Sequence, residues 1–230
     1  MRHMPDAVML FAAGFGTRMA PLTDTRPKPL IEVAGRALID HALALADDAG
    51  IGRIVVNTHY RGEQVATHLA ARPDIALSHE AEILETGGGL RHALPLLGTG
   101  PVFTLNTDAV WTGPNPLAAL RAAWDPARMD ALVMLITPKR ATGHAGAGDF
   151  LRSPDGALTR GPGAIYAGAQ ILRTDGLGEF REAAFSLNRL WDMMIARGRL
   201  FGVVHEGGWC DVGRPESIAL AERLLGGGDG

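Results

Sequence analysis

The chain has 230 residues, 47% of them hydrophobic and 20% charged, which is typical of a globular protein with a sizeable core. A formal net charge of −3 excludes a general field for capturing nucleic acid, so any anion binding must be local. A single cysteine, Cys210, excludes an internal disulfide and agrees with a reducing compartment. The apolar run after Met4 is too short for a signal peptide, and no run approaches the roughly 20 apolar residues of a membrane span. We therefore expect a cytoplasmic protein without membrane or nucleic-acid partners; its oligomeric state is not specified by the sequence.

The first half of the chain alternates short apolar runs with segments of helical periodicity. Strands are expected at residues 7–12, 53–57, 75–78, 101–106 and 131–137, and helices at 36–49, 62–71, 84–96 and 116–124. Strands and helices that alternate at this spacing predict an α/β fold with a mostly parallel sheet, of Rossmann-like type, covered by helices on both faces.

The second half has a different texture. Residues 138–163 are rich in Gly, Ala and Pro and predict a small antiparallel elaboration, with short strands at 149–151 and 157–159. Further along, strands are expected at 164–172 and 200–205 and helices at 187–196 and 215–225, whereas the tail 226–230 is expected to be disordered. Because no linker separates these segments, the sequence predicts a single domain.

A glycine-rich turn follows the first expected strand. Gly14 and Gly16 allow the backbone to approach a ligand closely, and successive N–H groups in such a turn form a concavity for anions. Arg18 and Lys28 follow within fifteen residues, and the prolines on both sides of Lys28 restrict the backbone that carries its ammonium group. We expect Lys28 to lie on an exposed loop. These features favour a polyphosphate site over a bare turn.

Two aspartates in distant segments are candidate ligands of a divalent cation. Asp108 follows the apolar strand PVFTLN, so it should face the crevice at the carboxyl ends of the parallel strands, unless it merely caps the next turn. Asp211 lies between apolar neighbours and glycines, and a buried aspartate needs a partner or a metal. Together with a phosphate-binding turn, the pair predicts a Mg²⁺ site.

The cysteine and the histidines suggest no chemistry of their own. Cys210 has no histidine arranged to activate it and is expected to pack in the core. None of the histidines shows metal-ligand spacing, and we expect His59, His68, His79 and His92 to be surface or hydrogen-bonded groups.

Residues 10–30 closely resemble the signature of the sugar-1-phosphate nucleotidyltransferases, approximately A-A-G-x-G-T-R-[LM]-x-P-L-T followed by P-K-P-L. The chain has this pattern at residues 12–23 and 27–30. Within the family it most resembles the short N-acetylmuramate α-1-phosphate uridylyltransferases of bacterial cell-wall recycling, through Leu84–Gly89, Asn106 with Asp108 and Trp111, Gly148–Phe150 and Trp209–Gly213. The resemblance covers nearly the whole chain.

This resemblance implies an enzyme that joins a nucleoside triphosphate, with UTP favoured, to a sugar-1-phosphate, with N-acetylmuramate α-1-phosphate favoured, and uses Mg²⁺. Residues 1–137 would mainly bind the nucleotide and residues 138–225 the sugar. The implied catalytic residues are Arg18, Lys28, Asp108 and Asp211, and the two aspartates would bind the metal. The implied nucleotide contacts are Ala13, Gly14, Gly16, Thr17, Arg18, Lys28 and Ala81, and the implied sugar-phosphate contacts are Asn106 and Asp149.

The chain departs from the family pattern at three positions. Ala81 and Thr107 stand where close relatives have glycine, and Arg214 stands where threonine often follows the glycine after the second aspartate. Alternatives therefore stay open within the class: a guanylyl- or thymidylyltransferase acting on another sugar-1-phosphate, or a choline-phosphate cytidylyltransferase. Outside it, a catalytically silent nucleotide sensor would not need the two aspartates, and an NAD-dependent enzyme is disfavoured by the missing third glycine.

Overall fold

The computed structural model describes residues 4–227 and is built around a seven-stranded sheet in the order β13-β8-β12-β6-β1-β4-β5. All adjacent pairs are parallel except the two that β12 makes with β6 and β8. The strands are β1 (Ala7–Phe11), β4 (Arg53–Thr58), β5 (Ile75–His79), β6 (Val102–Asn106), β8 (Ala131–Ile136), β12 (Ile165–Leu172) and β13 (Leu200–Val204). The predicted α/β class with a mixed, mostly parallel sheet is confirmed.

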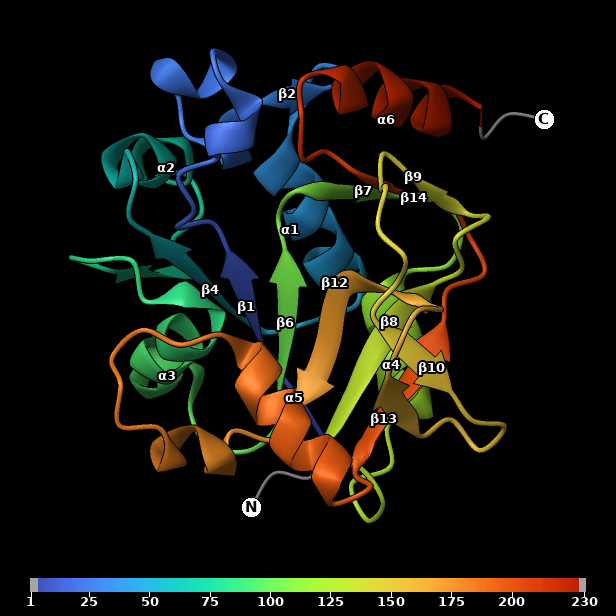
Figure 1. Ribbon diagram of the computed structural model, residues 1–230. Helices are drawn as coiled ribbons and strands as arrows, with labels where there is room; N and C mark the ends of the chain where they lie inside the picture. Colours follow the sequence, from blue (N-terminus) through green and yellow to red (C-terminus); the bar gives the residue numbers. More distant parts are fainter. Residues whose placement is uncertain (1–3, 228–230) are drawn as a thin grey trace.

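Helices cover both faces of this sheet, because alternate residues of the buried strands point to opposite sides. Val8 and Leu10 of β1 belong to one hydrophobic cluster, whereas Ala7 and Met9 belong to the other. The first cluster contains α1 (Leu38–Asp48), α2 (Gly62–His68) and α4 (Pro116–Ala123), and the second contains α3 (Glu85–Leu97) and α5 (Leu187–Ala196). Figure 1 shows α3 and α5 in front of the sheet and α1 and α4 behind it.

A smaller sheet, which the sequence patterns did not reveal, lies above the carboxyl ends of the central strands (Figure 1). It has the order β7-β14-β9, from strands β7 (Ala109–Trp111), β14 (Trp209–Asp211) and β9 (Ala141–Thr142). Helix α6 (Glu216–Gly226) packs on it, and a third hydrophobic cluster that includes Met19 and Cys210 fills the space between them. Cys210 is fully buried there, as expected of a packing residue.

The remaining elements are short. The expected antiparallel pair is present as β10 (Phe150–Arg152) and β11 (Leu158–Arg160). A two-stranded ribbon joins β2 (Glu32–Val33) to β3 (Arg36–Ala37), so the helix expected from residue 36 begins only at Leu38. Single 3₁₀ turns occupy η1 (Thr17–Met19), η2 (Leu22–Asp24), η3 (Lys28–Leu30) and η4 (Asp175–Glu179).

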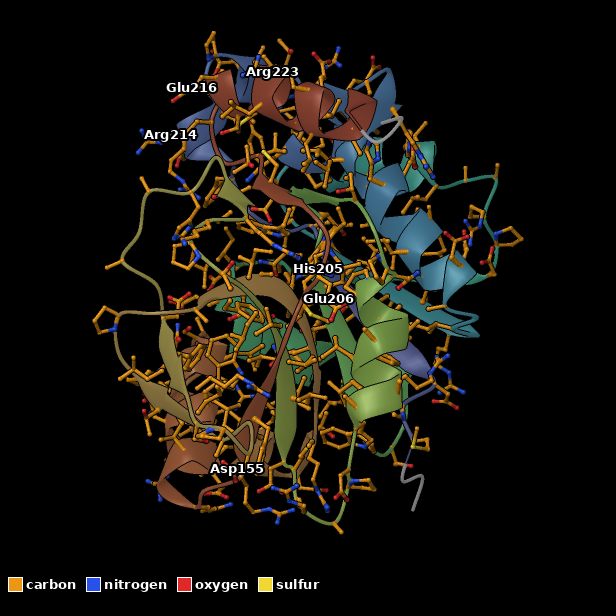
Figure 2. The ribbon with its side chains drawn as sticks, turned by 90° about the vertical axis from the view of Figure 1, so that its right-hand side faces the viewer. Asp155, His205, Glu206, Arg214, Glu216 and Arg223 are labelled. Carbon is orange, nitrogen blue, oxygen red and sulfur yellow. The ribbon has the colours of Figure 1, made fainter. Side chains whose placement is uncertain are left out.

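The two ends of the molecule are separated by the central sheet. Figure 2 shows Glu216 and Arg223 on α6 with Arg214 just before it, and Asp155, in the turn between β10 and β11, at the opposite end of the molecule. Helix α6 includes Gly226, so the first residue of the tail expected to be disordered at 226–230 is helical, and residues 228–230 lie outside the described part of the chain. Within residues 4–227, no helix is long and apolar enough to cross a membrane.

Candidate active site

The carboxyl ends of β1, β4, β5 and β6 meet at one edge of the sheet, which is where parallel sheets bind ligands. A cavity of about 230 Å³ opens there, and we call it the first cavity. The glycine turn, the loop that carries Lys28 and the start of α3 surround it. Its lining consists of Phe11, Ala12, Ala13, Gly14, Lys28, Pro29, Asn57, Glu80, Ile83, Glu85, Thr86, Asn106, Thr107 and Asp108.

The two glycines of the turn serve different purposes. Gly16 has a φ of +64°, and a Cβ built on it would lie 2.8 Å from the Cβ of Lys28, so both backbone conformation and space require glycine. Gly14, in contrast, lines the first cavity, and a Cβ built there would meet nothing within 4 Å. Since the fold does not require a glycine at this position, the space that it leaves is available to a ligand.

Lys28 lies against Asp108 on the wall of the first cavity. The Lys28 Nζ donates a hydrogen bond to Asp108 Oδ2 at 2.8 Å. Lys28 begins the η3 turn, and its side chain is only 11% exposed, so the expectation of an exposed loop lysine was wrong. The ion pair accounts for the burial, because a lysine ammonium leaves water only when it is paired.

Asp211 lies beside Asp108 because strand β14 pairs with β7, which directly follows Asp108. The backbone N–H of Val212 donates to the carbonyl of Asp108 at 2.8 Å. Burial raises the pKa of Asp211, and the charge of Asp108 raises this pKa further, whereas Lys28 and Arg18 lower it. A partly buried carboxylate beside a second carboxylate fits a divalent cation.

The protein offers only part of a metal coordination shell at this place. Among residues 4–227, no group of three or more His, Cys, Asp and Glu side chains is arranged to hold a metal ion. Mg²⁺ usually takes one or two carboxylates and completes its shell with water and substrate phosphate oxygens. The pair of aspartates fits that pattern and does not resemble an all-protein metal cage.

A buried polar network fixes the glycine turn to the far wall of the first cavity. Asn57, at the end of β4, accepts a hydrogen bond from the N–H of Ala12 at 2.7 Å and donates one to Glu80 Oε1 at 2.7 Å. The other oxygen of Glu80, Oε2, accepts from the N–H of Leu84 at 3.0 Å. Every named contact satisfies a buried group, so the network sets the width of the cavity.

The amino-terminal end of α3 is covered by a segment from the second half of the chain. The N–H groups of Gly87 and Gly88 both donate to the carbonyl of Phe185, at 2.8 and 3.1 Å. A Cβ on Gly88 would lie 2.2 Å from the carbonyl oxygen of Ala183, so this close approach requires glycine. These helix amides are therefore already bonded within the protein, and the three glycines serve packing here.

Glu85 precedes these glycines with a φ of +57°, a left-handed conformation that costs a residue other than glycine roughly 1–3 kcal/mol. Its exposed side chain lines the first cavity. Thr86 is anchored next to it, where its Oγ1 accepts a hydrogen bond from the N–H of Leu187 at 3.0 Å. The start of α3 and the start of α5 are thereby joined at the edge of the cavity.

A second cavity, also of about 230 Å³, adjoins the first, with Phe11, Thr86 and Asn106 lining both. Its other walls come from the second half of the chain. They comprise Asp149, Tyr166, Gln170, Ser186, Leu187, Asn188 and Trp191. The two cavities therefore meet over the carboxyl ends of β1 and β6, where a bond between two ligands could be made.

The structure brings some of the sequence-predicted site residues into these cavities and leaves others outside. Asp149 lines the second cavity and Asn106 lines both, whereas Ala13, Gly14, Lys28 and Asp108 line the first. Gly16, Thr17, Arg18, Ala81 and Asp211 line neither cavity.

The residues outside the cavities are not equally remote. Arg18 is exposed, but its Nη2 is 3.4 Å from where a Cβ on Gly213 would lie, and its charge acts on Asp211. Ala81 is exposed in the loop after β5, directly after Glu80. Arg214 is exposed at the start of the α6 region (Figure 2).

Sequence reasoning missed several polar residues of the two cavities, including Asn57, Glu80 and Asn188. The signal for the first two was available, because each stands at the end of an expected parallel strand, as Asp108 does. Asn188 gave no such signal, since it lies in the first turn of a helix whose role at the cavity depends on tertiary packing.

A profile of the MobA-like NTP transferase domain matches residues 8–202 of the chain. The chain is 43% identical to an N-acetylmuramate alpha-1-phosphate uridylyltransferase of Caulobacter vibrioides, over 98% of this chain and 99% of that protein. It is 36% identical to the protein of the same name from Neisseria meningitidis, over 95% and 97%. The solved structure of HddC from Yersinia pseudotuberculosis has a TM-score of 0.77 at 19% identity, covering 95% of this chain and 99% of that one, and shows the same fold.

The profile spans most of the chain, and both relatives align with it over nearly their full lengths. The aligned regions therefore include the glycine turn, the central sheet and the second half of this chain. On this evidence, the chain belongs to the sugar-1-phosphate nucleotidyltransferase family and has a MobA-like NTP transferase domain.

Proposed function

We propose that this enzyme transfers the uridylyl group of UTP to N-acetylmuramate α-1-phosphate, giving UDP-N-acetylmuramate and pyrophosphate. The observation that carries the proposal is the junction of the two cavities over β1 and β6, beside the Lys28–Asp108 pair. The activity in the names of the two near full-length relatives supports this choice of substrates.

We assign the nucleotide to the first cavity, which is built almost wholly from residues 1–137. Gly14 leaves room for a phosphate, and Lys28 would contact the α-phosphate. The exposed Arg18, together with the amides of Gly16 and Thr17, would hold the departing pyrophosphate. Ala13 would contact the nucleotide from the turn, and Ala81 would contact it from the loop after β5.

The sugar phosphate is assigned to the second cavity, whose distinctive walls come from residues 138–225. Asn106 lies where the cavities meet and would contact the phosphate of the incoming sugar. Asp149 would accept hydrogen bonds from sugar hydroxyls with Oδ1, because its Oδ2 already accepts one from the N–H of Tyr166 at 2.8 Å. This division gives each half of the single domain one substrate.

The residues fit Mg²⁺ as the cofactor, held by Asp108 and Asp211. The charge of Asp108, which raises the pKa of Asp211, supports this assignment. When bound, Mg²⁺ would neutralise charge on the reacting phosphates.

Nucleoside triphosphates are cytoplasmic substrates, and together with the single free cysteine they favour a cytoplasmic location.

In the reaction, an oxygen of the sugar phosphate attacks the α-phosphorus of UTP, and the bond from that phosphorus to the bridging oxygen of pyrophosphate breaks. The attacking oxygen is already ionised, so no general base is required. Catalysis then depends on positioning and on charge stabilisation. The junction of the cavities would position the two substrates, and Lys28 would supply part of the charge stabilisation.

The test is a panel of pyrophosphate-release assays. Each of the four common nucleoside triphosphates and dTTP is combined with N-acetylmuramate, N-acetylglucosamine, glucose and mannose 1-phosphates and with choline phosphate. We expect the highest kcat/KM for UTP with N-acetylmuramate 1-phosphate. A higher value for another pair would identify a different transferase, and no release with any pair would indicate a nucleotide sensor.

The metal assignment is tested in the same assay by titrating Mg²⁺. Asp211→Asn should raise the Mg²⁺ concentration needed for half-maximal activity, because it removes one anionic ligand. An exposed aspartate far from the cavities, Asp155, provides the matched control Asp155→Asn (Figure 2). Identical titration curves for the wild type and Asp211→Asn would refute the assignment.

A further inference from the structure

The second cavity is polar, but among residues 4–227 its lining contains no lysine or arginine. Asp149 is the only charged lining residue in this described part of the chain, and it is acidic. The side chain of an arginine contacts the lining from outside: Arg160, at the end of β11, donates from Nη2 to Asn188 Oδ1 at 3.0 Å and to the Asn188 carbonyl at 3.2 Å. A positive charge therefore lies behind Asn188 at the wall of the second cavity.

The guanidinium of Arg160 is held firmly at this wall. It lies over the ring of Trp191, which lines the second cavity, with 5.5 Å from Cζ to the ring centroid, and over Phe150 at 4.9 Å. Its Nε donates to Asp192 Oδ1 at 2.9 Å. Stacking on two aromatic faces and an ion pair on one edge fix the plane of the group and reduce the entropy lost when it binds a ligand.

Arg160 still has donors to offer. A guanidinium has five N–H groups, and the contacts with Asp192 and Asn188 engage only Nε and Nη2. The two N–H groups of Nη1 have no hydrogen-bond partner among the residues that the structure describes. With its side chain 38% exposed, Arg160 can bind an anion that reaches out of the second cavity past Asn188.

On the basis of the proposed function, we infer that Arg160 binds the carboxylate of the sugar substrate and sets the preference for an acidic sugar. N-acetylmuramate is N-acetylglucosamine with a lactyl ether on O3, so the two sugars differ by this group, whose carboxylate is the only charge that the ring substituents add. A planar guanidinium forms paired, charge-assisted hydrogen bonds with such a group. Asp149 would repel this carboxylate, whereas the guanidinium of Arg160 would attract it.

Neighbouring Arg189 provides a matched control. It also makes one ion pair, with Glu182 at 3.0 Å, and lies over one aromatic ring, that of Phe180, at 4.8 Å. Neither of these partners lines the second cavity. Arg189→Gln thus removes an exposed ion pair and an aromatic contact, as Arg160→Gln does, at the residue after Asn188. The guanidinium that it removes makes neither of these contacts with the cavity lining.

The experiment measures kcat/KM with UTP for N-acetylmuramate 1-phosphate and N-acetylglucosamine 1-phosphate in the wild type and in Arg160→Gln, Arg160→Lys and Arg189→Gln. Arg160→Gln should lower the value for N-acetylmuramate 1-phosphate by about 10- to 100-fold, as expected for loss of a charge-assisted hydrogen bond. The value for N-acetylglucosamine 1-phosphate should change by less than about threefold. Arg160→Lys should fall between the wild type and Arg160→Gln, because it keeps the charge and loses the planar fork.

Arg189→Gln should leave the ratio of the two substrates unchanged, and its melting temperature should match that of Arg160→Gln within a few degrees. An equal loss of kcat/KM for both sugars in Arg160→Gln would mean that Arg160 only supports the fold. Wild-type kcat/KM values for both sugars would remove Arg160 from substrate recognition. Either result overturns the inference. A wild type that does not prefer N-acetylmuramate 1-phosphate would instead refute the proposed substrate, and the inference with it.

Discussion

Lys28 and Asp108, 80 residues apart in the sequence, are joined by a hydrogen bond of 2.8 Å between Nζ and Oδ2 on the wall of the first cavity. Each group would have a different partner in the loaded enzyme: a phosphate for Lys28 and Mg²⁺ for Asp108. Before substrates bind, the two groups neutralise each other. The ion pair therefore holds both side chains at the cavity without leaving a buried charge unpaired.

Lys28→Met should abolish most activity while the protein stays folded. Removing one preorganised charge from a transferring phosphoryl group costs about 10²- to 10³-fold in kcat. The loss of stability should be about 1 kcal/mol, because Asp108 is 33% exposed and water can replace the ammonium. Pyrophosphate release and urea unfolding measure the two effects. Lys139→Met changes the only other lysine, which is exposed, and serves as the control. If the activity of Lys28→Met were within tenfold of this control, the proposed contact of Lys28 with the reacting phosphate would be contradicted.

Alanine at Gly14 and at Gly16 should have different effects. Gly14→Ala places a Cβ where no protein atom lies within 4 Å, so stability should hardly change, whereas the KM for UTP should rise at least tenfold if a phosphate occupies this space. Gly16→Ala should destabilise the fold by about 1–2 kcal/mol, because the backbone is left-handed and Lys28 is too close. Melting temperatures and UTP titrations separate the two cases. An unchanged KM in Gly14→Ala would remove the turn from phosphate binding.

The central sheet could be predicted from the sequence because its strands are continuous apolar runs separated by helices of regular period. Asp149 and Asn106 were expected near the sugar phosphate through family resemblance, and their place beside the second cavity agrees with that expectation without testing it. What could not be predicted depends on contacts between distant segments.

The small sheet β7-β14-β9 is one such case, since its strands have two or three residues and no periodicity to detect. The burial of Lys28 is another, because the two prolines beside it indicate a restricted loop but not its distance from Asp108. The glycines at 87–89 also had an ambiguous meaning: only the structure shows that Phe185 and Ala183 pack against Gly87 and Gly88, and Glu80 against Gly89.

Asn57→Leu should damage both the fold and nucleotide binding. The change removes the partner of the Ala12 N–H and of the Oε1 atom of the buried Glu80, at a cost of about 2–4 kcal/mol. The glycine turn loses its tether to the opposite wall, so we expect the KM for UTP to rise at least tenfold. Urea unfolding and UTP titration measure these effects.

The control for Asn57→Leu is Asn115→Ala, which removes the side-chain cap of α4 from the N–H groups of Leu117 and Ala118. It should cost about 1 kcal/mol of stability without changing the KM. If both variants changed the KM equally, the effect of Asn57→Leu would come from general instability and not from the turn.

Cys210 should be chemically silent in the folded enzyme. Burial raises the pKa of its thiol to about 11, and the charge of Asp211 contributes to the increase. Because the thiolate is the reactive form, a thiol reagent at pH 8 should label less than a tenth of the folded protein in an hour and all of it in urea. Cys210→Ala should retain activity within threefold. Rapid labelling of the folded protein would show that the β14–α6 region opens readily.

His205 should make the enzyme less stable in mild acid. Its side chain is buried and packs at 5.1 Å against Trp111, with Nε2 3.0 Å from the carbonyl oxygen of Thr112. Burial lowers the pKa of His205; the charge of Arg140 lowers it too, whereas the hydrogen bond to Thr112 and the charge of Glu206 oppose the change. The unfolded chain then binds a proton more readily than the folded one. Stability is complete above about pH 6.5 and declines as the pH falls toward the folded-state pKa.

The contribution of His205 between pH 7.5 and 5.5 is at most about 1.4 kcal/mol, the value for a histidine that stays neutral in the fold over this range. His205→Gln removes the titrating group, so the difference in unfolding free energy between these two pH values should become smaller by up to that amount. Urea unfolding at both pH values, in the wild type and the variant, provides the measurement. His68→Gln, at a histidine on the molecular surface that contacts Asp40 at 2.9 Å, controls for the loss of a histidine as such. If His205→Gln keeps the full pH dependence of the wild type, the acid sensitivity arises from other groups. The fold would then not hold His205 in its neutral form.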